Sequence, residues 1–426
     1  MKNKLKKTVL SIEEKYPFFG KQLIALLRFL RYFFYYKPFF YFSKIKFPAI
    51  DIFKVYWINP AKIKYCFDGE INLQKERGTI KGGQWDRGRK KFEELEIYKG
   101  MKSRFIEGKN WEDTKFYSEI LKQIRDGKVV YGCYTEEKFK ENLKKIDKLY
   151  DSITKEGYKN QLEIEKENYS GDLSYKKIDE ILASIGRDGQ FIFNDGAHRL
   201  AIAKILKIPK VPVMIVIRHK KWIEFKEECF SFAKLSGGKL YQPAYHPDLE
   251  DIPSSPAKEK FNLIESNLGV KQGKVLDIGA NLGYFCFKLE EIGFNCCAVE
   301  ISPQEIYFLK RLKTTNDARF EIFQDSIFDY QRDKLLDFDI VLTLNIFHHF
   351  LKRESSYEEL KKLLRHLRCQ EMFFESHNPR ESQMKGAFRN YTPEEFVKFI
   401  LKNSCLDNYS LLKEFPNGRR LYKLFS

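Results

Sequence analysis

The chain has 426 residues, of which 43% are hydrophobic and 32% charged, and its formal net charge is +17. This apolar content argues against a disordered chain, and the length predicts two globular domains. The eight cysteines include no C-x-x-C pair. Their spacing therefore argues against a disulfide framework and against a zinc site, so we expect no metal centre and a reducing, cytoplasmic location.

Residues 1–48 form a basic and aromatic segment. Residues 1–64 carry 14 Lys or Arg against three acids, and residues 29–42 contain ten aromatics. Leu and Phe side chains within 21–35 fall on one helical face, which is typical of an interfacial helix on an anionic membrane. We therefore expect residues 20–45 to bind the inner membrane face, with docking on the next domain or on a partner protein as the alternative. Interspersed Lys and Arg exclude a transmembrane helix or secretory signal here.

Residues 49–234 have the pattern of a mixed α+β domain. Residues 51–70 predict two short strands around a Pro turn, and charged helical patterns run from 86 to 165. The strand "QFIFNDG", a helix over 198–206 and the strand "VPVMIVIRH" follow. Residues 235–258 collect Gly, Pro and Ser, which predicts an interdomain linker.

From residue 259 to residue 426 strands and helices alternate. "KVLDIG", "CCAVEI", "FEIFQD", "FDIVLTLN" and "EMFFES" read as strands separated by helical runs. This order predicts βαβ units in a doubly wound, mostly parallel, Rossmann-like sheet. A capping box at Thr392 predicts a helix over about 393–402, and "YSLLKEF" and "RRLYKLF" predict two closing strands.

The turn after "KVLDIG" is the main candidate for a cofactor site. It reads Asp277-Ile278-Gly279-Ala280-Asn281-Leu282-Gly283, and Glu300 ends the next strand 17 residues later. Small residues at a strand-to-helix turn allow a ligand to approach the backbone. A dinucleotide fingerprint would need glycines where Asn281 and Tyr284 stand.

The pattern D-x-G-x-N-x-G instead resembles motif I of the class I S-adenosylmethionine-dependent methyltransferases. The resemblance implies that Asp277, Gly279, Asn281 and Gly283 bind the cofactor, with Asp277 near its amino-acid part, and that Glu300 binds its ribose hydroxyls. It also implies that Asp325 and Ser326 bind the adenine amino group. "FDIVLTLNIFHHF" resembles motif IV and implies that Asn345 lies beside the methyl donor.

The catalytic base is left open by the residues. His348 and His349 directly follow motif IV and either could accept a proton from a hydroxyl nucleophile. Glu375 and His377 at the end of the next strand are rivals, and a packing role is an alternative for the His pair. Methyl transfer can also proceed through proximity and orientation without a strong base.

"NDGAHR" at 194–199 is a second candidate site. Gly196 permits an unusual turn, free N–H groups at a helix start attract anions, and His198 and Arg199 add donors. The stretch "FNDGAHRLAIAKILKIPKVPVMIVIRH" resembles the ParB/sulfiredoxin-like superfamily, which implies that Asp195, Gly196, His198 and Arg199 bind a phosphate or nucleotide. If the domain is a kinase, its ligand is ATP or CTP with Mg, and Asp195 is the base or metal ligand. Without a ligand, Asp195 would only begin the helix and Arg199 would form a salt bridge.

The two domains together resemble uncharacterised microbial proteins associated with surface polysaccharides, through "WEDTKFY", "NDGAHRLAIAKIL", "YQPAYHPDLEDIP" and "VLDIGANLGYFC". The sequence thus predicts a cytoplasmic, membrane-peripheral methyltransferase whose N-terminal domain binds phosphate or phosphorylates, and whose acceptor is a glycan or a phosphorylated molecule. An RNA-directed methyltransferase using the basic N-terminus is the first alternative, although the aliphatic residues there disfavour nucleic acid. A ParB-like nucleotide-dependent DNA-binding regulator is the second.

Overall fold

The structure is a computed structural model that describes residues 54–67, 76–88, 90–160, 163, 180–331 and 335–426. The chain divides into two compact units, Met1–Phe225 and Lys226–Ser426. The basic segment 1–48, with its predicted membrane helix, lies outside the described residues. Within the described part of the chain, every helix is too short or too polar to span a bilayer.

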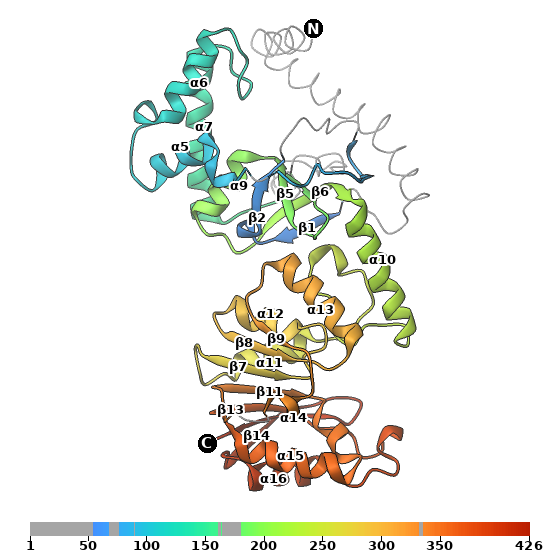
Figure 1. Ribbon diagram of the computed structural model, residues 1–426. Helices are drawn as coiled ribbons and strands as arrows, with labels where there is room; N and C mark the ends of the chain where they lie inside the picture. The colour runs from blue at the N-terminus through green and yellow to red at the C-terminus, as the bar shows by residue number, and fades with distance from the viewer. Residues whose placement is uncertain (1–53, 68–75, 89, 161–162, 164–179, 332–334) are drawn as a thin grey trace. The chain divides into compact units, whose positions relative to one another are not determined.

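The first unit is built on a mixed six-stranded sheet (Figure 1). Its strands are β1 (Val55–Ile58), β2 (Ile63–Cys66), β3 (Thr79–Lys81), β4 (Ile181–Ile185), β5 (Phe191–Asp195) and β6 (Val211–His219). The order is β1-β6-β4-β5-β2, and β3 also pairs with β6. All nine residues of β6 are buried, as expected for the apolar run "VPVMIVI" in a central strand.

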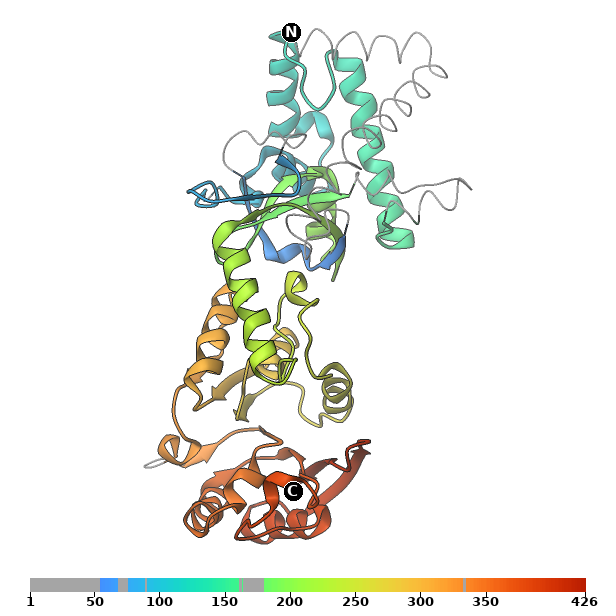
Figure 2. The same cartoon turned by 90° about the vertical axis from the view of Figure 1, so that its right-hand side faces the viewer.

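The described part of the first unit also contains α-helices. They are α5 (Glu96–Phe105), α6 (Lys115–Arg125), α7 (Glu136–Glu156), α9 (Ala197–Ile205) and the first part of α10 (Lys220–Leu235). The 21-residue α7 is the longest of these helices (Figure 2). The predicted strands of "QFIFNDG" and "VPVMIVIRH" are confirmed, and the helix between them begins and ends one residue earlier than predicted.

The second unit contains a seven-stranded sheet in the order β14-β15-β13-β11-β7-β8-β9. The strands are β7 (Lys274–Ile278), β8 (Asn295–Val299), β9 (Glu321–Phe323), β11 (Ile340–Leu344), β13 (Glu371–Glu375), β14 (Asn408–Glu414) and β15 (Arg420–Phe425). A separate small pair joins β10 (Leu336–Asp337) to β12 (Leu367–Arg368). Strands β7, β8, β9, β11 and β13 are parallel, while β15 is antiparallel to both β13 and β14. The predicted mostly parallel, Rossmann-like sheet is confirmed.

Helices follow most of these strands (Figure 1). They are α11 (Lys258–Ser266), α12 (Tyr284–Glu291), α13 (Pro303–Asn316), α14 (Ile327–Tyr330), α15 (Glu354–His366) and α16 (Pro393–Asn403). A core cluster joins α15 and α16 to one sheet face through buried residues such as Leu363, Phe374 and Phe396. Because the parallel strands share a direction, the residues after β7, β8, β11 and β13 meet at one sheet edge, where ligands of such sheets bind.

Residues 235–258, predicted as a linker, lie within the second compact unit. The segment contains the buried side chains Gln242, His246 and Leu249 and a short 3-10 turn, Pro247–Leu249. Its Gly and Pro content therefore marks irregular backbone that packs on the C-terminal sheet unit, and two of its side chains reach the candidate site.

Candidate active site

Asp277 is a buried carboxyl in β7, one residue before the strand ends. It is 2% exposed, and its Oδ2 accepts a hydrogen bond from Cys286 Sγ at 3.4 Å. No cationic side chain pairs with it among the residues that the structure describes. Burial raises the pKa of Asp277 to about 7, the hydrogen bond from Cys286 opposes this, and nearby Glu300 raises it further. A buried carboxyl of this kind favours a cationic ligand.

The loop after Asp277 has an unusual backbone conformation. Gly279 and Gly283 have left-handed φ values of 76° and 78°, and Asn281 has 53°. A Cβ on Gly279 would lie 2.9 Å from Ile346 Cδ1, and one on Gly283 would lie 2.4 Å from Leu309 Cδ1. Both positions therefore require glycine for conformation and for space. Gly283 directly precedes α12, whose first N–H, on Tyr284, donates to Gln242 Oε1 at 3.0 Å.

Glu300 anchors this loop to the end of β8. One carboxylate oxygen, Oε2, accepts from the Asn281 N–H at 2.8 Å, and the other accepts from the N–H groups of Ile301 and Ser302. A carboxylate offers about four lone-pair sites. One acceptor site on Oε2 thus remains for a ribose hydroxyl, the role that the sequence resemblance implies for Glu300.

Asp325 and Ser326 follow β9 and begin α14. Ser326 Oγ caps the helix by accepting from the Phe328 N–H at 3.2 Å, and Asp325 Oδ1 accepts from the Ser326 N–H at 2.8 Å. Asp325 is exposed. Both residues thus have a local structural role, and the adenine contact expected of them stays a prediction.

Asn345 follows β11 in a left-handed conformation, with φ 60°. Its Nδ2 donates to the Tyr241 hydroxyl at 2.6 Å, whereas its Oδ1 is buried without a hydrogen-bond partner. Asn281 Oδ1 is likewise buried and unpartnered. Unsatisfied buried polar atoms are rare in proteins and need an explanation, such as a bound ligand.

These features fit S-adenosylmethionine, which carries an ammonium and a sulfonium but no phosphate. Asp277 supplies a buried anion, and Asn281 and Asn345 supply unused amide oxygens. The sequence-predicted cofactor residues are therefore gathered at the ends of β7, β8 and β11, while Asp325 and Ser326 lie after β9.

The two histidines after β11 differ in environment. His348 is 2% exposed, and its Nε2 lies 3.2 Å from Gln383 Oε1. Burial, together with the neighbouring His349, Arg419 and His377, lowers the pKa of His348 to about 3. His349 is exposed, and Lys352 Nζ donates to its Nδ1 at 3.2 Å. Because its Nδ1 already has a donor, His349 suits proton transfer less well than His348.

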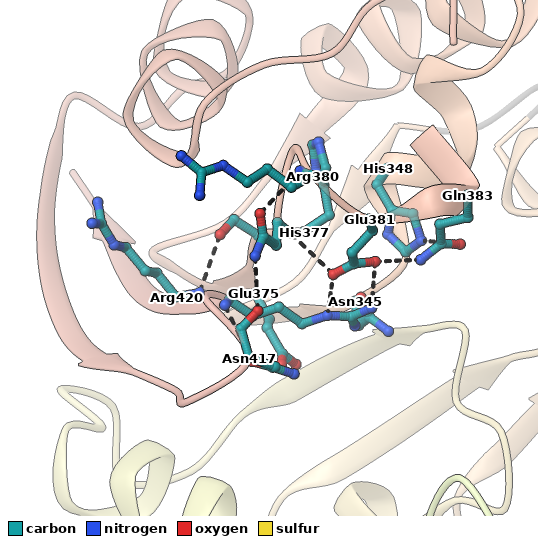
Figure 3. A network of polar contacts seen from close by, with 12 residues as sticks. Asn345, His348, Glu375, His377, Arg380, Glu381, Gln383, Asn417 and Arg420 are labelled. Carbon is teal, nitrogen blue, oxygen red and sulfur yellow. Dashed lines mark hydrogen bonds and ion pairs between the residues drawn. The ribbon is translucent and has the colours of Figure 1, made fainter. Parts of the chain in front are cut away.

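The rival candidates after β13 are also buried. His377 is 1% exposed, and its Nε2 lies 3.0 Å from Asn390 Oδ1. Glu375 forms an ion pair with Lys260. A hydrogen bond then connects Gln383 to Glu381 (Figure 3). Arg419 forms an ion pair with Glu381 at 2.7 Å.

Sequence reasoning missed three contributors to this site. Tyr241 contacts Asn345, Gln242 contacts the start of α12, and Cys286 contacts Asp277. Tyr241 and Gln242 belong to the predicted linker, where no periodicity signals a role. Cys286 lies three residues after Gly283, on the buried face of α12. Its position one helical turn into α12 is the signal from which the sequence could have indicated a contact with Asp277.

The "NDGAHR" loop lies between β5 and α9 in the first unit. Gly196 has a left-handed φ of 91°, and Asp195 is exposed, with its Oδ1 accepting from the Gly196 N–H at 2.7 Å. Arg199 lies 3.9 Å from the buried Glu180 carboxylate. Burial, followed by the charge of Arg199, lowers the pKa of His198. The Asp195 carboxylate thus accepts a hydrogen bond within its own turn, and the donors His198 and Arg199 lie one helical turn further along the chain.

Two cavities flank α9. One of about 230 Å³ is lined by His198 together with Phe116, Tyr131, Phe139, Asn142, Leu143, Lys145, Ile146 and Leu149. The other, of about 510 Å³, includes Lys64, Lys91, Lys204 and Lys207 in its lining, with Glu93 as the acidic residue. The first cavity adjoins the loop, and the second lies at the opposite end of the helix, so an anion has two candidate locations in this unit.

Comparison with known proteins agrees with the C-terminal site. Residues 276–367 match a family model described as a methyltransferase domain. No curated protein sequence matches the chain significantly. With the strand-end residues above, the match makes the C-terminal unit the domain of an S-adenosylmethionine-dependent methyltransferase, and the enzyme class predicted from the sequence is confirmed.

Solved structures with similarity to the chain are distant. WbdD, described as a bifunctional kinase-methyltransferase, is 22% identical over 46% of this chain and 46% of its own, with a TM-score of 0.39. The N-methyltransferase NodS of Bradyrhizobium japonicum is 15% identical over 40% of this chain and 95% of its own, with a TM-score of 0.32. The chain thus spans less than half the length of WbdD, and these low scores carry no argument about function.

Proposed function

We propose that the enzyme transfers a methyl group from S-adenosylmethionine to a glycan or a phosphorylated acceptor, and that the "NDGAHR" loop binds a phosphate or nucleotide. The observation that carries the first part is Asp277, a buried carboxyl with no cationic partner among the described residues. A cationic methyl donor would supply that partner.

The chain's own residues suggest how the donor is held. Asp277 would pair with its positive charge, and Glu300 would use the remaining site on Oε2 for a ribose hydroxyl. The Asn281 amide oxygen would accept from its ammonium, and Asn345 would lie beside the methyl group that is transferred. When bound, the donor supplies an electrophilic methyl group, and the protein contributes mainly positioning.

The phosphate-binding part of the proposal rests on the start of α9. The first N–H groups of a helix lack partners within the helix, and Gly196 lets the backbone turn into it. His198 and Arg199 would add donors, with Asp195 as base or metal ligand if ATP or CTP with Mg is bound. A kinase activity here is the sharper form of the proposal, and peripheral binding of residues 20–45 to an anionic membrane is part of it.

Calorimetric titration tests both sites on the full chain. S-adenosylmethionine, ATP and CTP are titrated into wild type, Asp277→Asn and Arg199→Ala. Asp407→Asn, at an exposed position, serves as the matched control. We expect Asp277→Asn to abolish only donor binding and Arg199→Ala to abolish only nucleotide binding. Unchanged binding in both variants would contradict both site assignments.

Two further variants separate the alternatives. Loss of nucleotide binding in Lys207→Ala, with Arg199→Ala unaffected, would move the anion to the lysine-lined cavity. Methyl transfer to RNA that falls steeply with salt and is lost on deleting residues 1–50 would favour the RNA-directed alternative. Mass spectrometry showing no mass gain on any glycan acceptor would count against the acceptor class.

A further inference from the structure

Two buried histidines lie next to each other at the carboxyl ends of β11 and β13. His348 is 2% exposed and His377 is 1% exposed, and their ring centroids are 5.7 Å apart. Both have pKa values lowered chiefly by burial, which keeps the rings neutral at physiological pH. A neutral ring has one N–H donor and one lone-pair acceptor, so the contacts of each ring decide which nitrogen is which.

The contacts of His348 place its proton on Nε2. Burial would raise the pKa of Glu381, but hydrogen bonds from Arg419 and Gln383 lower it to about 2, so this carboxylate only accepts. Gln383 must therefore turn its amide nitrogen toward Glu381, which it contacts at 2.5 Å. Its amide oxygen then faces His348 Nε2 at 3.2 Å (Figure 3). An amide oxygen is an acceptor, so Nε2 carries the hydrogen and Nδ1 carries the lone pair.

The contacts of His377 give the same tautomer by a separate route. Asn390 Nδ2 donates to the Pro379 carbonyl at 2.9 Å, which fixes the orientation of the Asn390 amide. The amide oxygen then lies 3.0 Å from His377 Nε2, so this nitrogen also carries the hydrogen. His377 Nδ1 is left with a lone pair.

Three acceptors in this region have no donor among the residues that the structure describes. The Nδ1 atoms of His348 and His377 are buried without a hydrogen-bond partner, and so is Asn345 Oδ1. Asn345 Nδ2 is engaged with Tyr241, which holds the other end of that amide. Each such atom costs about 1–3 kcal/mol when left unsatisfied, and the cost is recovered when a ligand supplies a donor. We call these three atoms the acceptor cluster.

The acceptor cluster restricts which chemical group a ligand can place beside it. A phosphate or carboxylate oxygen would present lone pairs to lone pairs, which is repulsive. An ammonium would need an unpaired anion, but Glu375 pairs with Lys260 and Glu381 pairs with Arg419. A neutral hydroxyl can donate to the cluster and needs no counter-charge.

We infer that the nucleophile methylated by this enzyme is an alcohol hydroxyl of the acceptor, and that the acceptor cluster receives its O–H group. This inference rests on the proposed methyl transfer and names the reacting group. The hydroxyl oxygen forms a bond to the methyl carbon as the carbon–sulfur bond breaks, the bonding pair stays on sulfur, and His348 Nδ1 takes the hydroxyl proton. His377 Nδ1 accepts a hydrogen bond from a neighbouring hydroxyl of the acceptor, and His377 is a positioning residue.

A weakly basic imidazole is sufficient for this proton transfer. As the new carbon–oxygen bond forms, the hydroxyl oxygen gains positive character and its proton becomes strongly acidic. His348 therefore need not deprotonate a free alcohol, and its role is to accept the proton late in the reaction. The buried Nδ1 lone pair of His348 can accept this proton, because burial shields it from protons of the solvent.

Nitrogen NMR of the full chain, labelled with ¹⁵N-histidine, tests the tautomers without any ligand. We expect His348 and His377 to show a protonated Nε2 and an unprotonated Nδ1 at neutral pH, assigned by comparison with His348→Gln and His377→Gln. A protonated Nδ1 on either ring overturns the inference. Because this measurement needs no methyl donor, it is independent of the proposed function.

Methyl transfer from methyl-labelled S-adenosylmethionine to a panel of neutral sugars, amino sugars and sugar phosphates tests the reacting group. We expect the label in methyl ethers, and label in a methyl phosphate or an N-methyl group overturns the inference. His348→Gln keeps an amide N–H toward Gln383 but removes the Nδ1 lone pair, so the rate should fall about 100-fold or more with donor affinity retained. His366→Gln, an exposed control on α15, should retain the wild-type rate.

The remaining outcomes separate the two claims. If the donor binds but no sugar is labelled, the hydroxyl inference is overturned. If the donor does not bind at all, the proposed function fails instead, and the NMR tautomers still decide whether the acceptor cluster exists. A His348→Gln variant that retains the wild-type rate removes His348 from the reaction.

Discussion

The two candidate loops share their local geometry but differ in what their carboxyl groups contact. Each loop follows a strand, contains a left-handed glycine and leads into a helix, α12 after Gly283 and α9 after Gly196. Asp277 is buried without a cationic partner in the described chain, whereas Asp195 is exposed and accepts from its neighbour's N–H. Backbone shape alone therefore does not identify a binding site. A buried carboxyl without a cationic partner is a stronger indication of a binding site, because a ligand that pairs with it offsets the free-energy cost of burying the charge.

The largest expected effect separates the two loops by packing. Gly283→Ala places a Cβ 2.4 Å from Leu309 Cδ1 at a φ of 78°, so strain and overpacking add. We expect a loss of about 2–4 kcal/mol in the free energy of unfolding, measured in urea. Gly293→Ala, with φ 101° and nothing within 4 Å, should lose only the conformational part, about 1–2 kcal/mol. The loss in the free energy of unfolding for Gly196→Ala should lie between those of the other two variants. Equal losses in all three variants would show that packing at Gly283 is not tight.

The second prediction compares the two carboxyl groups directly. Asp277→Asn should weaken S-adenosylmethionine binding by about 100-fold or more, since a buried charge pair is lost. Asp195→Asn should leave that affinity within about twofold, because it lies in the other compact unit. Isothermal calorimetry on both variants checks this, and similar losses in the two would remove the distinction between the loops.

The third prediction uses pH. The pKa of Asp277 in the ligand-free protein is raised to about 7, and the ionised form is needed to pair with a cation. Donor affinity should therefore fall about tenfold for each pH unit below 7 and level off above it. In Asp277→Asn this dependence should vanish. A wild-type affinity that is constant from pH 5 to pH 8 would show that the carboxyl does not contact the cation.

The same carboxyl affects stability in the opposite direction. Its pKa is raised above the ordinary value of 3.8, so its contribution is fully present below that pH and is lost as pH rises through about 7. Ligand-free Asp277→Asn should consequently show a higher Tm than wild type at pH 8 and a smaller difference at pH 5. Thermal unfolding of both proteins, with Asp407→Asn as control, measures this.

The smallest expected effect concerns Tyr241. Tyr241→Phe removes the hydrogen bond from Asn345 Nδ2 and frees that amide to rotate. A lost hydrogen bond of this kind is worth about 1 kcal/mol, so donor affinity should fall about fivefold. Tyr409→Phe, at a distant exposed tyrosine, is the matched control. No change in Tyr241→Phe would mean that Asn345 is held by its backbone alone.

Much of the fold could be predicted from the sequence because it depends on local patterns. "KVLDI" and "IVLTL" are short apolar runs that form buried parallel strands, and Thr392 with Glu395 forms the predicted capping box. The strand-end positions of Asp277, Glu300 and Asn345 follow from that alternation. The roles assigned to them from family resemblance remain predictions.

The rest of the site depends on contacts that sequence spacing does not encode. Tyr241 lies 104 residues before Asn345, and Gln383 follows His348 by 35 residues in a short 3-10 helix, Ser382–Met384. Neither pair has a periodic signal, because loops position side chains through tertiary packing. The tautomer of each histidine depends in turn on such partners, which explains why the sequence left the catalytic base open between His348 and His349, with Glu375 and His377 as rivals.

The contact between Gln242 and the start of α12 bears on cofactor selectivity. In sheets that bind dinucleotides, the first N–H groups of the corresponding helix receive the pyrophosphate. Here the Tyr284 N–H is already taken by the Gln242 amide oxygen at 3.0 Å, and that oxygen would repel a phosphate. The chain thus blocks its own anion-binding position with a neutral side chain. We therefore expect Gln242, 42 residues before Tyr284, to disfavour nicotinamide and flavin dinucleotides at this turn.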